Sequence, residues 1–326
     1  MSRVICIGSA CKDVFFPTTE GKIIETPEDL LSQQKIEFEL GAKYRIEERF
    51  EALGGCAANV AVGLSRLGID AACYSHIGND HVADWILDQL KKNKVSVDLI
   101  TKDKELFSDM SAIVVDRNSA EHVIFSNQKV SGKLELVPEK ISSAEWIFIG
   151  DLHGDWRSQL DLISRIAKEH KLKLAYNPKQ IHIHDDVKKI IEIITETEVL
   201  FLNKDEALEV ISQIKNFSTS DLDNEFFLLQ ELKEMGANIV VITDGVRGAW
   251  ATNGTDVLYA PGRMVKALDS TGAGDSFASG FLGAHIKGKI LKVCLDWGIV
   301  NSSHEVRFYG SIKGLLDEKE MLENGG

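Results

Sequence analysis

The sequence lacks several features that mark large classes of proteins. Its five cysteines are an odd number with no Cys-x-x-Cys pair, so neither a disulfide framework nor a zinc site is indicated. No apolar run approaches membrane-spanning length, and the first residues read as a strand rather than as a signal peptide. With a formal net charge of -13, no basic face is indicated for nucleic acid or an anionic membrane. We therefore expect a cytoplasmic protein that binds neither nucleic acid nor a membrane.

Two common nucleotide-binding motifs are also missing. The lack of Gly-x-x-x-x-Gly-Lys-Ser/Thr excludes a P-loop enzyme, and without a Gly-x-Gly-x-x-Gly after the first strand, dinucleotide binding loses its main support. The chain does contain 44% apolar residues over 326 positions, which is enough for a sizeable core. Its length suggests about two domains, although large α/β proteins often form one.

Apolar runs alternate with helical patterns along most of the chain. The runs that read as strands are residues 4–8, 71–77, 146–149, 172–176, 199–202 and 239–242. Segments such as 80–93 and 156–171 lie between them and read as helices. Continuous apolar strands separated by helices imply a mostly parallel sheet that is covered on both faces. The predicted fold class is therefore α/β.

Two regions depart from this alternation of strands and helices. Apolar and polar side chains alternate over residues 36–40 and again over 44–46, which is the period of half-buried strands. Segments 110–115 and 121–125 flank an Asp-Arg-Asn-Ser sequence and read as a hairpin. We expect these regions to form a small separate β-sheet. The predicted division assigns residues 14–50 with 110–126 to that small sheet, and residues 1–13, 51–109 and 127–326 to the α/β domain.

The most informative stretch, residues 269–275, reads Asp-Ser-Thr-Gly-Ala-Gly-Asp and is followed by a helical pattern. The first amides of a helix have no internal partners, so those of Gly272, Ala273 and Gly274 are placed to cradle an anion. Asp275 at the same end is placed to accept a proton from a hydroxyl nucleophile. The alternative is that Asp275 only caps the helix and that the glycines form a flexible entry.

A second glycine pair, Gly54-Gly55, precedes another small-residue helical pattern that includes Asn59. Together the two segments resemble the two signatures of the ribokinase-like (PfkB-type) carbohydrate kinases, and the resemblance extends from residue 4 to about residue 316. It implies a ribokinase-like fold with a small β-sheet lid that closes over the substrate and often pairs with a second subunit. A homodimer through the lid is therefore the expected assembly.

The resemblance also implies the activity. The chain is expected to be an ATP-dependent kinase that transfers the γ-phosphate to a hydroxyl group of a sugar or sugar-like substrate. Asp275 matches the family's catalytic base, and Gly272, Ala273 and Gly274 match its anion hole. These roles agree with those inferred from the residues themselves.

Two further segments resemble the nucleotide side of this family. Asn203 and Glu206 follow the apolar run 199–202 as Asn-x-x-Glu, which in the family organises Mg²⁺ through water. The alternative for this pair is a helix N-terminus with a capping box. The family's nucleotide-side hairpin corresponds to Thr243, Gly245 and Gly248, although Asp-Gly is also an ordinary hairpin signal. Asn301 lies in a segment that resembles the helix flanking the adenine.

The acceptor side follows from the same resemblance. The matching positions are Asp13 as a hydroxyl-binding carboxylate, Gly54, Gly55 and Asn59 as the sugar-side signature, and Asn177 at a later strand end. Ribokinase-type members carry Asn and Lys where this chain has Cys11 and Cys56, which argues against ribose. Lys179 stands where an Asp-x-Asn-x-Arg motif has Arg, and losing the bidentate fork of Arg argues against a phosphorylated substrate.

Asp269 and Thr271 occupy the family's monovalent-cation positions, so K⁺ is a candidate activator, with internal hydrogen bonding by the Thr hydroxyl as the alternative.

Gly-Asp151-Leu-His153-Gly resembles an element of metal-dependent phosphoesterases, but the other two metal-binding elements of those enzymes are missing. In a kinase, Asp151 at a strand end suits a contact with a substrate hydroxyl. The remaining alternatives are a nucleoside kinase on the same scaffold and a catalytically idle binding protein.

Overall fold

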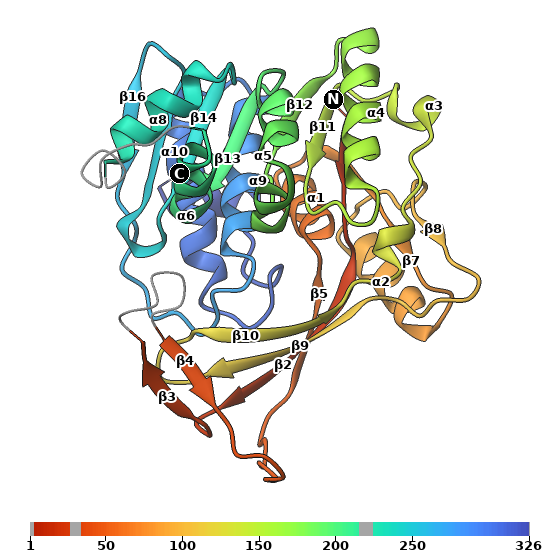
Figure 1. Ribbon diagram of the computed structural model, residues 1–326, viewed down its shortest axis with the longest axis vertical. Coiled ribbons are helices and arrows are strands. Elements are labelled where there is room, and N and C mark those ends of the chain that lie inside the picture. Colours follow the sequence, from red (N-terminus) through yellow and green to blue (C-terminus); the bar gives the residue numbers. More distant parts are fainter. Residues whose placement is uncertain (1–2, 27–33, 215–223, 326) are drawn as a thin grey trace.

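The computed structural model describes residues 3–26, 34–214 and 224–325. Its main body is built on an eight-stranded sheet with the order β16-β15-β14-β13-β12-β11-β1-β6 (Figure 1). The strands are β1 Arg3–Ile7, β6 Asp70–Tyr74, β11 Trp146–Ile149, β12 Lys173–Tyr176, β13 Val199–Asn203, β14 Ile239–Thr243, β15 Ala249–Thr252 and β16 Val257–Ala260. Only β15 and β16, at one edge, join antiparallel. The prediction of a mostly parallel α/β sheet is confirmed.

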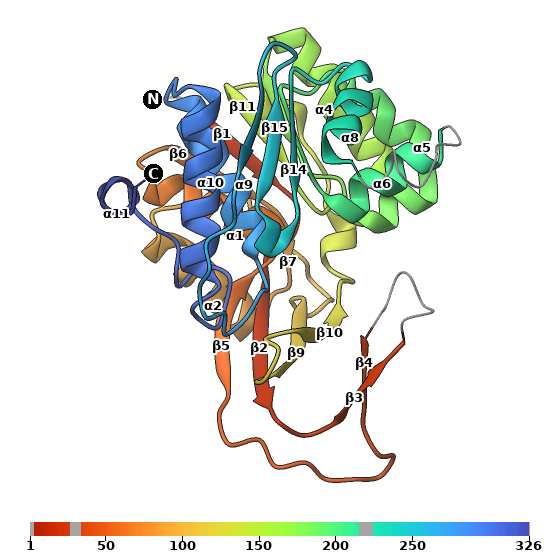
Figure 2. The ribbon, with the colours of Figure 1, turned by 90° about the vertical axis from the view of Figure 1, so that its left-hand side faces the viewer.

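Helices cover both faces of this sheet (Figure 2). One face packs against α1 Cys56–Arg66, α2 His81–Lys92, α9 Ala273–Ile286 and α10 Leu291–Glu305, and the other against α4 Trp156–His170, α5 Gln180–Ile194, α6 Lys204–Ser212 and α8 Glu225–Glu234. β1 is apolar from Val4 to Ile7 because side chains on both of its faces are buried. Val4 and Cys6 belong to the first apolar cluster, whereas Ile5 and Ile7 belong to the second.

Shorter elements complete the main body. They are β7 His76–Ile77 paired with β8 Thr101–Lys102, η1 Ser131–Lys133, α3 Pro138–Ile141, η2 Gly245–Arg247 and α11 Glu318–Glu323. No helix within the described ranges is long and apolar enough to cross a membrane.

A second sheet of four strands lies at one end of the main body (Figures 1 and 2). Its order is β10-β9-β2-β5, formed by β10 His122–Asn127, β9 Met110–Asp116, β2 Cys11–Thr18 and β5 Phe50–Gly54. β9 and β10 pair antiparallel, as the predicted hairpin requires. An apolar cluster of Phe15, Ile113 and Val115 joins this sheet to Tyr309 of the main body. β3 Lys22–Glu25 and β4 Gln34–Glu37 form a separate two-stranded sheet.

Of the apolar residues in the alternating pattern over 36–46, only the half-buried Ile36 lies in a predicted strand, where it forms part of β4. β4 ends at Glu37, and no strand occurs between it and β5. Leu40 is fully exposed, and the rings of Phe38 and Tyr44 contact each other edge to face with their centroids 5.3 Å apart. Alternation predicts a strand only where one face is buried, and here these apolar side chains remain at the surface.

Asn301 connects α10 to α9 in the core. Its side-chain amide donates to the Ser276 carbonyl at 2.8 Å and to Ser279 Oγ at 3.2 Å, and its Oδ1 accepts the Leu316 N–H at 3.0 Å. The side chain is 1% exposed. This placement differs from the predicted nucleotide contact, because both amide donors are already used inside the protein.

Asn301→Ala is therefore expected to act on stability. Three hydrogen bonds are lost and buried groups are left unpaired, so the free energy of unfolding falls by about 2–4 kcal/mol. Urea unfolding measures this change, and calorimetric titration with ADP measures the affinity of the folded variant. Unchanged unfolding together with a large loss of ADP affinity would instead support the original nucleotide assignment.

Candidate functional site

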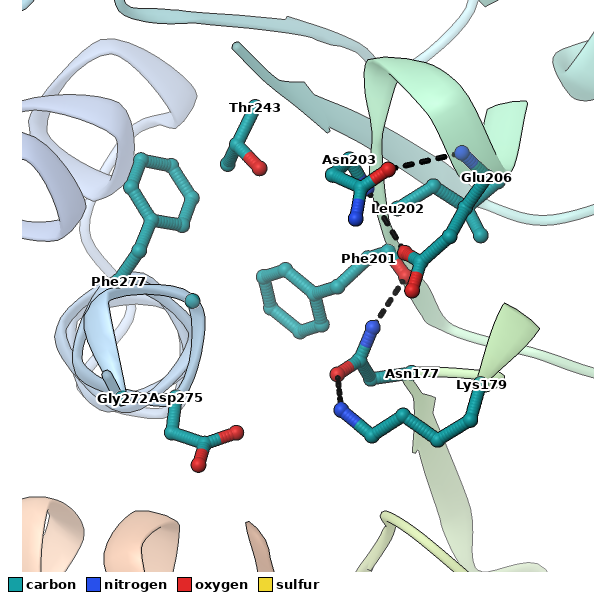
Figure 3. A pocket seen from close by; sticks show the side chains of 11 residues that line it. Asn177, Lys179, Phe201, Leu202, Asn203, Glu206, Thr243, Gly272, Asp275 and Phe277 are labelled. Atoms are coloured by element: carbon teal, nitrogen blue, oxygen red, sulfur yellow. Dashed lines mark hydrogen bonds between the residues drawn. The ribbon is translucent and has the colours of Figure 1, made fainter. Parts of the chain in front are cut away.

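A pocket opens where the carboxyl ends of β12, β13 and β14 meet the start of α9 (Figure 3). In parallel α/β sheets this edge is the usual place for a ligand, because the strands end there and loops diverge. The lining residues are Asn177, Lys179, Phe201, Leu202, Asn203, Glu206, Thr243, Gly272, Gly274, Asp275 and Phe277. Segments far apart in the sequence thus form a single polar cavity.

The loop before α9 is fixed from its first residue. Asp269 is 0% exposed, and its carboxylate accepts the Thr271 N–H at 3.0 Å and the Gly310 N–H at 3.2 Å. Gly272 is the N-cap of α9 with φ 85°, and a Cβ at this position would clash with Ser311. Only glycine meets both conditions easily, which explains its place in the motif.

Two of the three residues predicted to form an anion hole line the pocket at this helix N-terminus. Gly272 and Gly274 line the pocket, and Gly274 is exposed. Ala273 does not line it, and its N–H donates to the Ser270 carbonyl at 3.2 Å. The turn itself therefore uses one of the three expected donors.

Asp275 lies in the first turn of α9 and faces the pocket (Figure 3). Its Oδ2 accepts a hydrogen bond from Asn59 Nδ2 at 2.9 Å, whereas the N-cap of α9 has no side-chain capping bond. The structure thus offers no support for the alternative in which Asp275 only caps the helix. Burial raises the pKa of Asp275, against the opposing effects of Lys179 and of hydrogen bonds from Asn59 and Cys56.

Lys179 lies across the pocket from Asp275 (Figure 3). Its Nζ donates to Asn177 Oδ1 at 2.9 Å, and Asn177 Nδ2 donates to the Phe201 carbonyl at 3.0 Å. Burial lowers the pKa of Lys179, but nearby acidic groups, led by Cys56 and Asp275, outweigh burial and raise it. Lys179 is therefore a cation held inside an acidic pocket.

Asn203 and Glu206 form the capping box that was the alternative interpretation of this motif. Asn203 Oδ1 accepts the Glu206 N–H at 2.8 Å, and Glu206 Oε2 accepts the Asn203 N–H at 2.9 Å. Both residues nevertheless line the pocket. Burial raises the pKa of Glu206, although the charge of Lys179 acts against it. Capping and pocket lining are compatible, because the cap fixes the carboxylate at the rim.

The nucleotide-side hairpin lies next to this rim. Thr243, the last residue of β14, lines the pocket. Gly245 and Gly248 lie in the turn that follows, which the Asp244 N–H closes by donating to the Gly248 carbonyl at 2.9 Å. Neither glycine lines the pocket, so their observed role is to shape the turn.

Two carboxylates mark the predicted acceptor side. Asp13 is 5% exposed, and Cys11 Sγ lies 3.4 Å from its Oδ1. Burial raises the pKa of Asp13 to about 6, and a Cβ at Gly54 would clash with its carboxylate. Asp151 accepts the Ser9 N–H at 3.0 Å and also bonds the Ser9 hydroxyl. Gly55, the N-cap of α1, brings that helix with Asn59 to the same region.

The phosphoesterase alternative requires a metal-binding cluster that the described residues do not provide. His153 Nε2 lies 3.5 Å from Asp151 Oδ2, but no group of three or more His, Cys, Asp or Glu side chains within the described ranges could hold a metal ion. The Gly-Asp-x-His-Gly element thus lacks the ligands that a metal pair needs.

The sequence interpretation did not identify the apolar wall of the pocket. Phe201 and Leu202 lie just before Asn203, the last residue of β13, and Phe277 lies two residues after Asp275 on α9. Each belongs to an apolar pattern that was assigned to the core. The positions of Phe201 and Leu202, directly before Asn203 at a strand end, were the signal that could have revealed them.

Known proteins resemble this chain over nearly its whole length. The model of the pfkB family carbohydrate kinases matches residues 1–315. An ATP-dependent 6-phosphofructokinase of Thermoanaerobacterium thermosaccharolyticum is 23% identical, over 86% of this chain and 87% of that protein. A nucleoside kinase of Methanocaldococcus jannaschii is 26% identical, over 99% and 96%.

The fold agrees with these relatives. A putative ribokinase II from E. coli, solved in complex with ATP and Mg²⁺, superposes with a TM-score of 0.79 at 16% identity, and the match covers 99% of each chain. The family inferred from the two glycine signatures is thus confirmed by an independent match of sequence and by the fold. This chain belongs to the pfkB family of carbohydrate kinases, phosphotransferases that act on a hydroxyl acceptor.

Proposed function

We propose that the protein transfers the γ-phosphate of ATP to a hydroxyl group of a sugar or sugar-like substrate, with Asp275 as general base. The observation that carries this proposal is the position of Asp275, which faces the pocket beside Gly272 and Gly274 at the start of α9 (Figure 3). The E. coli relative solved with ATP and Mg²⁺ supports the choice of cofactors.

In the proposed reaction the acceptor hydroxyl donates its proton to Asp275, and its oxygen forms a bond to the γ-phosphorus. The bond from that phosphorus to the bridging oxygen breaks, and the electron pair leaves with ADP. The amides of the turn before α9 stabilise the charge on the transferring group, and Lys179 supplies a positive charge from the opposite wall. Most of the remaining acceleration comes from holding the two substrates in line.

Asn203 and Glu206 fit the role of holding Mg²⁺ through its water shell. One carboxylate oxygen of Glu206 accepts the Asn203 N–H, and both side chains line the pocket. When bound, Mg²⁺ neutralises phosphate charge and orients the terminal phosphates. The chain's contribution is to fix the carboxylate at the rim before the metal arrives.

Asp275→Asn is expected to lower kcat by about 10²–10⁴, the range for a lost general base. ADP affinity should stay near the wild-type value, because the variant keeps the turn amides. An assay of ADP release over sugars, phosphorylated sugars and nucleosides, with and without Mg²⁺, first identifies the acceptor and then measures the variant. Asp70→Asn, an exposed position on β6, is the matched control.

The pH profile of kcat gives a second test of Asp275 as the general base. A base works only when ionised, so kcat falls as decreasing pH protonates it. Because the pKa of Asp275 is raised above 3.8, the acid limb should lie above that pH. The pKa of Asp151 is lowered, so a limb below 3.8 would point to Asp151 instead. Near-wild-type turnover of Asp275→Asn would refute the assignment outright, and phosphate release without an acceptor would indicate a hydrolase.

A nucleoside kinase is the second candidate, supported by the Methanocaldococcus jannaschii relative that matches 99% of this chain. Asp13 and Asp151 suit the hydroxyl groups of either acceptor class, since a carboxylate accepts hydrogen bonds from hydroxyls. The same acceptor panel separates the two. Turnover with nucleosides and none with sugars would establish the second candidate.

We further propose that Asp269, Thr271 and Glu305 form the surroundings of a K⁺ ion. Glu305 ends α10 and is 0% exposed, and neither of its carboxylate oxygens has a hydrogen-bond partner among the described residues. Burial raises the pKa of Glu305, and so do the nearby charges of Asp269 and Asp275. A bound cation would compensate these buried acids, because an unpaired buried carboxylate is otherwise costly.

The melting temperature should therefore be higher in potassium chloride than in tetramethylammonium chloride of equal ionic strength, since an ion that binds only the folded state stabilises it. Glu305→Gln should shrink this difference, whereas the exposed Glu323→Gln should not. Differential scanning calorimetry measures both. Equal melting temperatures in the two salts would mean that Glu305 is a buried neutral acid.

We also propose that the second sheet is the lid and that its free edge joins two subunits. β10 is one of the two edge strands, and Val123, Ile124 and Phe125 on it are 38%, 44% and 65% exposed. An uncovered edge strand with apolar side chains readily pairs with another strand. A second copy of the chain would cover these side chains.

Sedimentation velocity tests this assembly. Wild type should sediment as a dimer and Phe125→Lys as a monomer, because the substitution places a charge in the paired edge. Phe226→Lys is the control, since Phe226 is a similarly exposed phenylalanine on α8. A monomeric wild type would contradict the proposal.

A further inference from the structure

A histidine of the second sheet contacts the loop that leads to the anion hole. His122 is the first residue of β10, and its Nδ1 lies 3.3 Å from Ser270 Oγ and 3.4 Å from Thr271 Oγ1. All three residues are partly buried. Both distances allow a hydrogen bond, so the ring nitrogen has two hydroxyl groups to choose between.

The contacted residues lie between two fixed points of the loop. Asp269 before them is held by the N–H groups of Thr271 and Gly310, and Gly272 after them caps α9. Ser270 and Thr271 therefore set the path from a fixed residue to the first residue of the turn. A small shift of this path moves the Gly272 amide, and amides that stabilise a transition state must be placed within a fraction of an ångström.

The sheet that carries His122 also carries an acceptor-side carboxylate. β10 pairs with β9 through His122 and Val115, and β9 pairs with β2, where Asp13 lies opposite Ser111. Asp13 and His122 thus belong to one hydrogen-bonded unit. A sheet position set by an acceptor at Asp13 also sets the position of His122 against the loop.

The second sheet is attached to the main body by contacts other than the one that His122 makes. Tyr309 of the main body stacks on Phe50 with ring centroids 4.6 Å apart, and its ring lies 6.5 Å from that of Phe15. These aromatic contacts bury apolar surface, which a partly exposed hydrogen bond to a hydroxyl does not. Loss of the His122 contact should therefore affect the loop more than the stability of the protein.

We propose that His122 is a positioning residue for phosphoryl transfer. It holds Ser270 and Thr271 so that the turn amides before α9 reach the transferring group, and it does so from the sheet that also presents Asp13. The inference rests on the proposed kinase function. His122 acts through the loop and is not itself assigned a contact with substrate.

The experiment compares two substitutions at this position. His122→Phe keeps a ring and removes both nitrogens, whereas His122→Asn keeps a polar atom at the position of Nδ1. We expect His122→Phe to lower kcat roughly 10-fold with little change in KM for ATP, because misplacement penalises the transition state most. His122→Asn should recover most of the lost kcat. Ser126→Ala, an exposed change on the same strand, should match wild type.

A double-mutant cycle tests the contact from its other side. Ser270→Ala combined with Thr271→Val removes the two hydroxyls and should lower kcat to a similar extent. Adding His122→Phe to this pair should cause little further loss, because both changes remove the same interaction. Thermal melting of every variant is recorded, and this hydroxyl-side pair gives the answer if His122→Phe does not fold.

A binding measurement gives a readout that needs no acceptor. Titration with ADP and aluminium fluoride, which mimics the transferring phosphoryl group, should be weakened by His122→Phe, while titration with ADP alone should not. Equal kcat for His122→Phe and wild type would overturn the proposal, as would a His122→Asn variant as slow as His122→Phe. If wild type transfers phosphate and only these results fail, the kinase function stands and His122 alone loses its role.

Discussion

The site depends on an acidic side chain that is held partly away from water beside the positive end of a helix. At Asp275, burial favours the protonated form, while Lys179 and the hydrogen bonds from Asn59 and Cys56 favour the ionised form. A carboxylate balanced in this way has a raised pKa and still remains an acceptor. A carboxylate with a raised pKa is a stronger proton acceptor than an ordinary one, which suits the proposed role of general base.

The rest of the pocket also places a positive charge next to acidic groups. Lys179 is the single cation that lines the described pocket, and it faces Asp275 and Glu206. A protein with a net charge of -13 has no broad positive field to attract a nucleotide. The donors that line the pocket are local ones, namely backbone amides at the start of α9 and the Lys179 ammonium group.

The second sheet is joined to the main body by a small apolar contact and by the polar contact of His122. Its apolar contact with Tyr309 is small compared with the two core clusters of the main body. Small interfaces between layers allow rigid-body motion at low cost. The contact of His122 with Ser270 and Thr271 is polar, and its distances of 3.3 and 3.4 Å are long for hydrogen bonds, so a small displacement of the sheet would break it.

Local patterns in the sequence identified the elements of the site, but they did not determine every role. The run ending in Asp275 predicted both the helix and the base, because glycines and an acid at a helix start have few other uses. For Asn203 and Glu206 the pattern left two interpretations open, a capping box and a site for Mg²⁺. The structure shows that the two residues form the capping box and also line the pocket. For Asn301 the pattern did not reveal the burial between α9 and α10, because that burial depends on packing that no local spacing encodes.

The sequence by itself determined the alternation of strands and helices, since buried parallel strands require continuous apolar runs and covering helices require amphipathic ones. It also predicted that residues 269–275 lead into a helix, which begins at Ala273. Only the tertiary structure decided that Lys179 faces Asp275, that Phe201 lines the pocket and that His122 reaches the loop. These contacts join residues up to about 150 positions apart in the sequence. They are determined by the register of the two sheets and by how the helices cross, and not by local propensity.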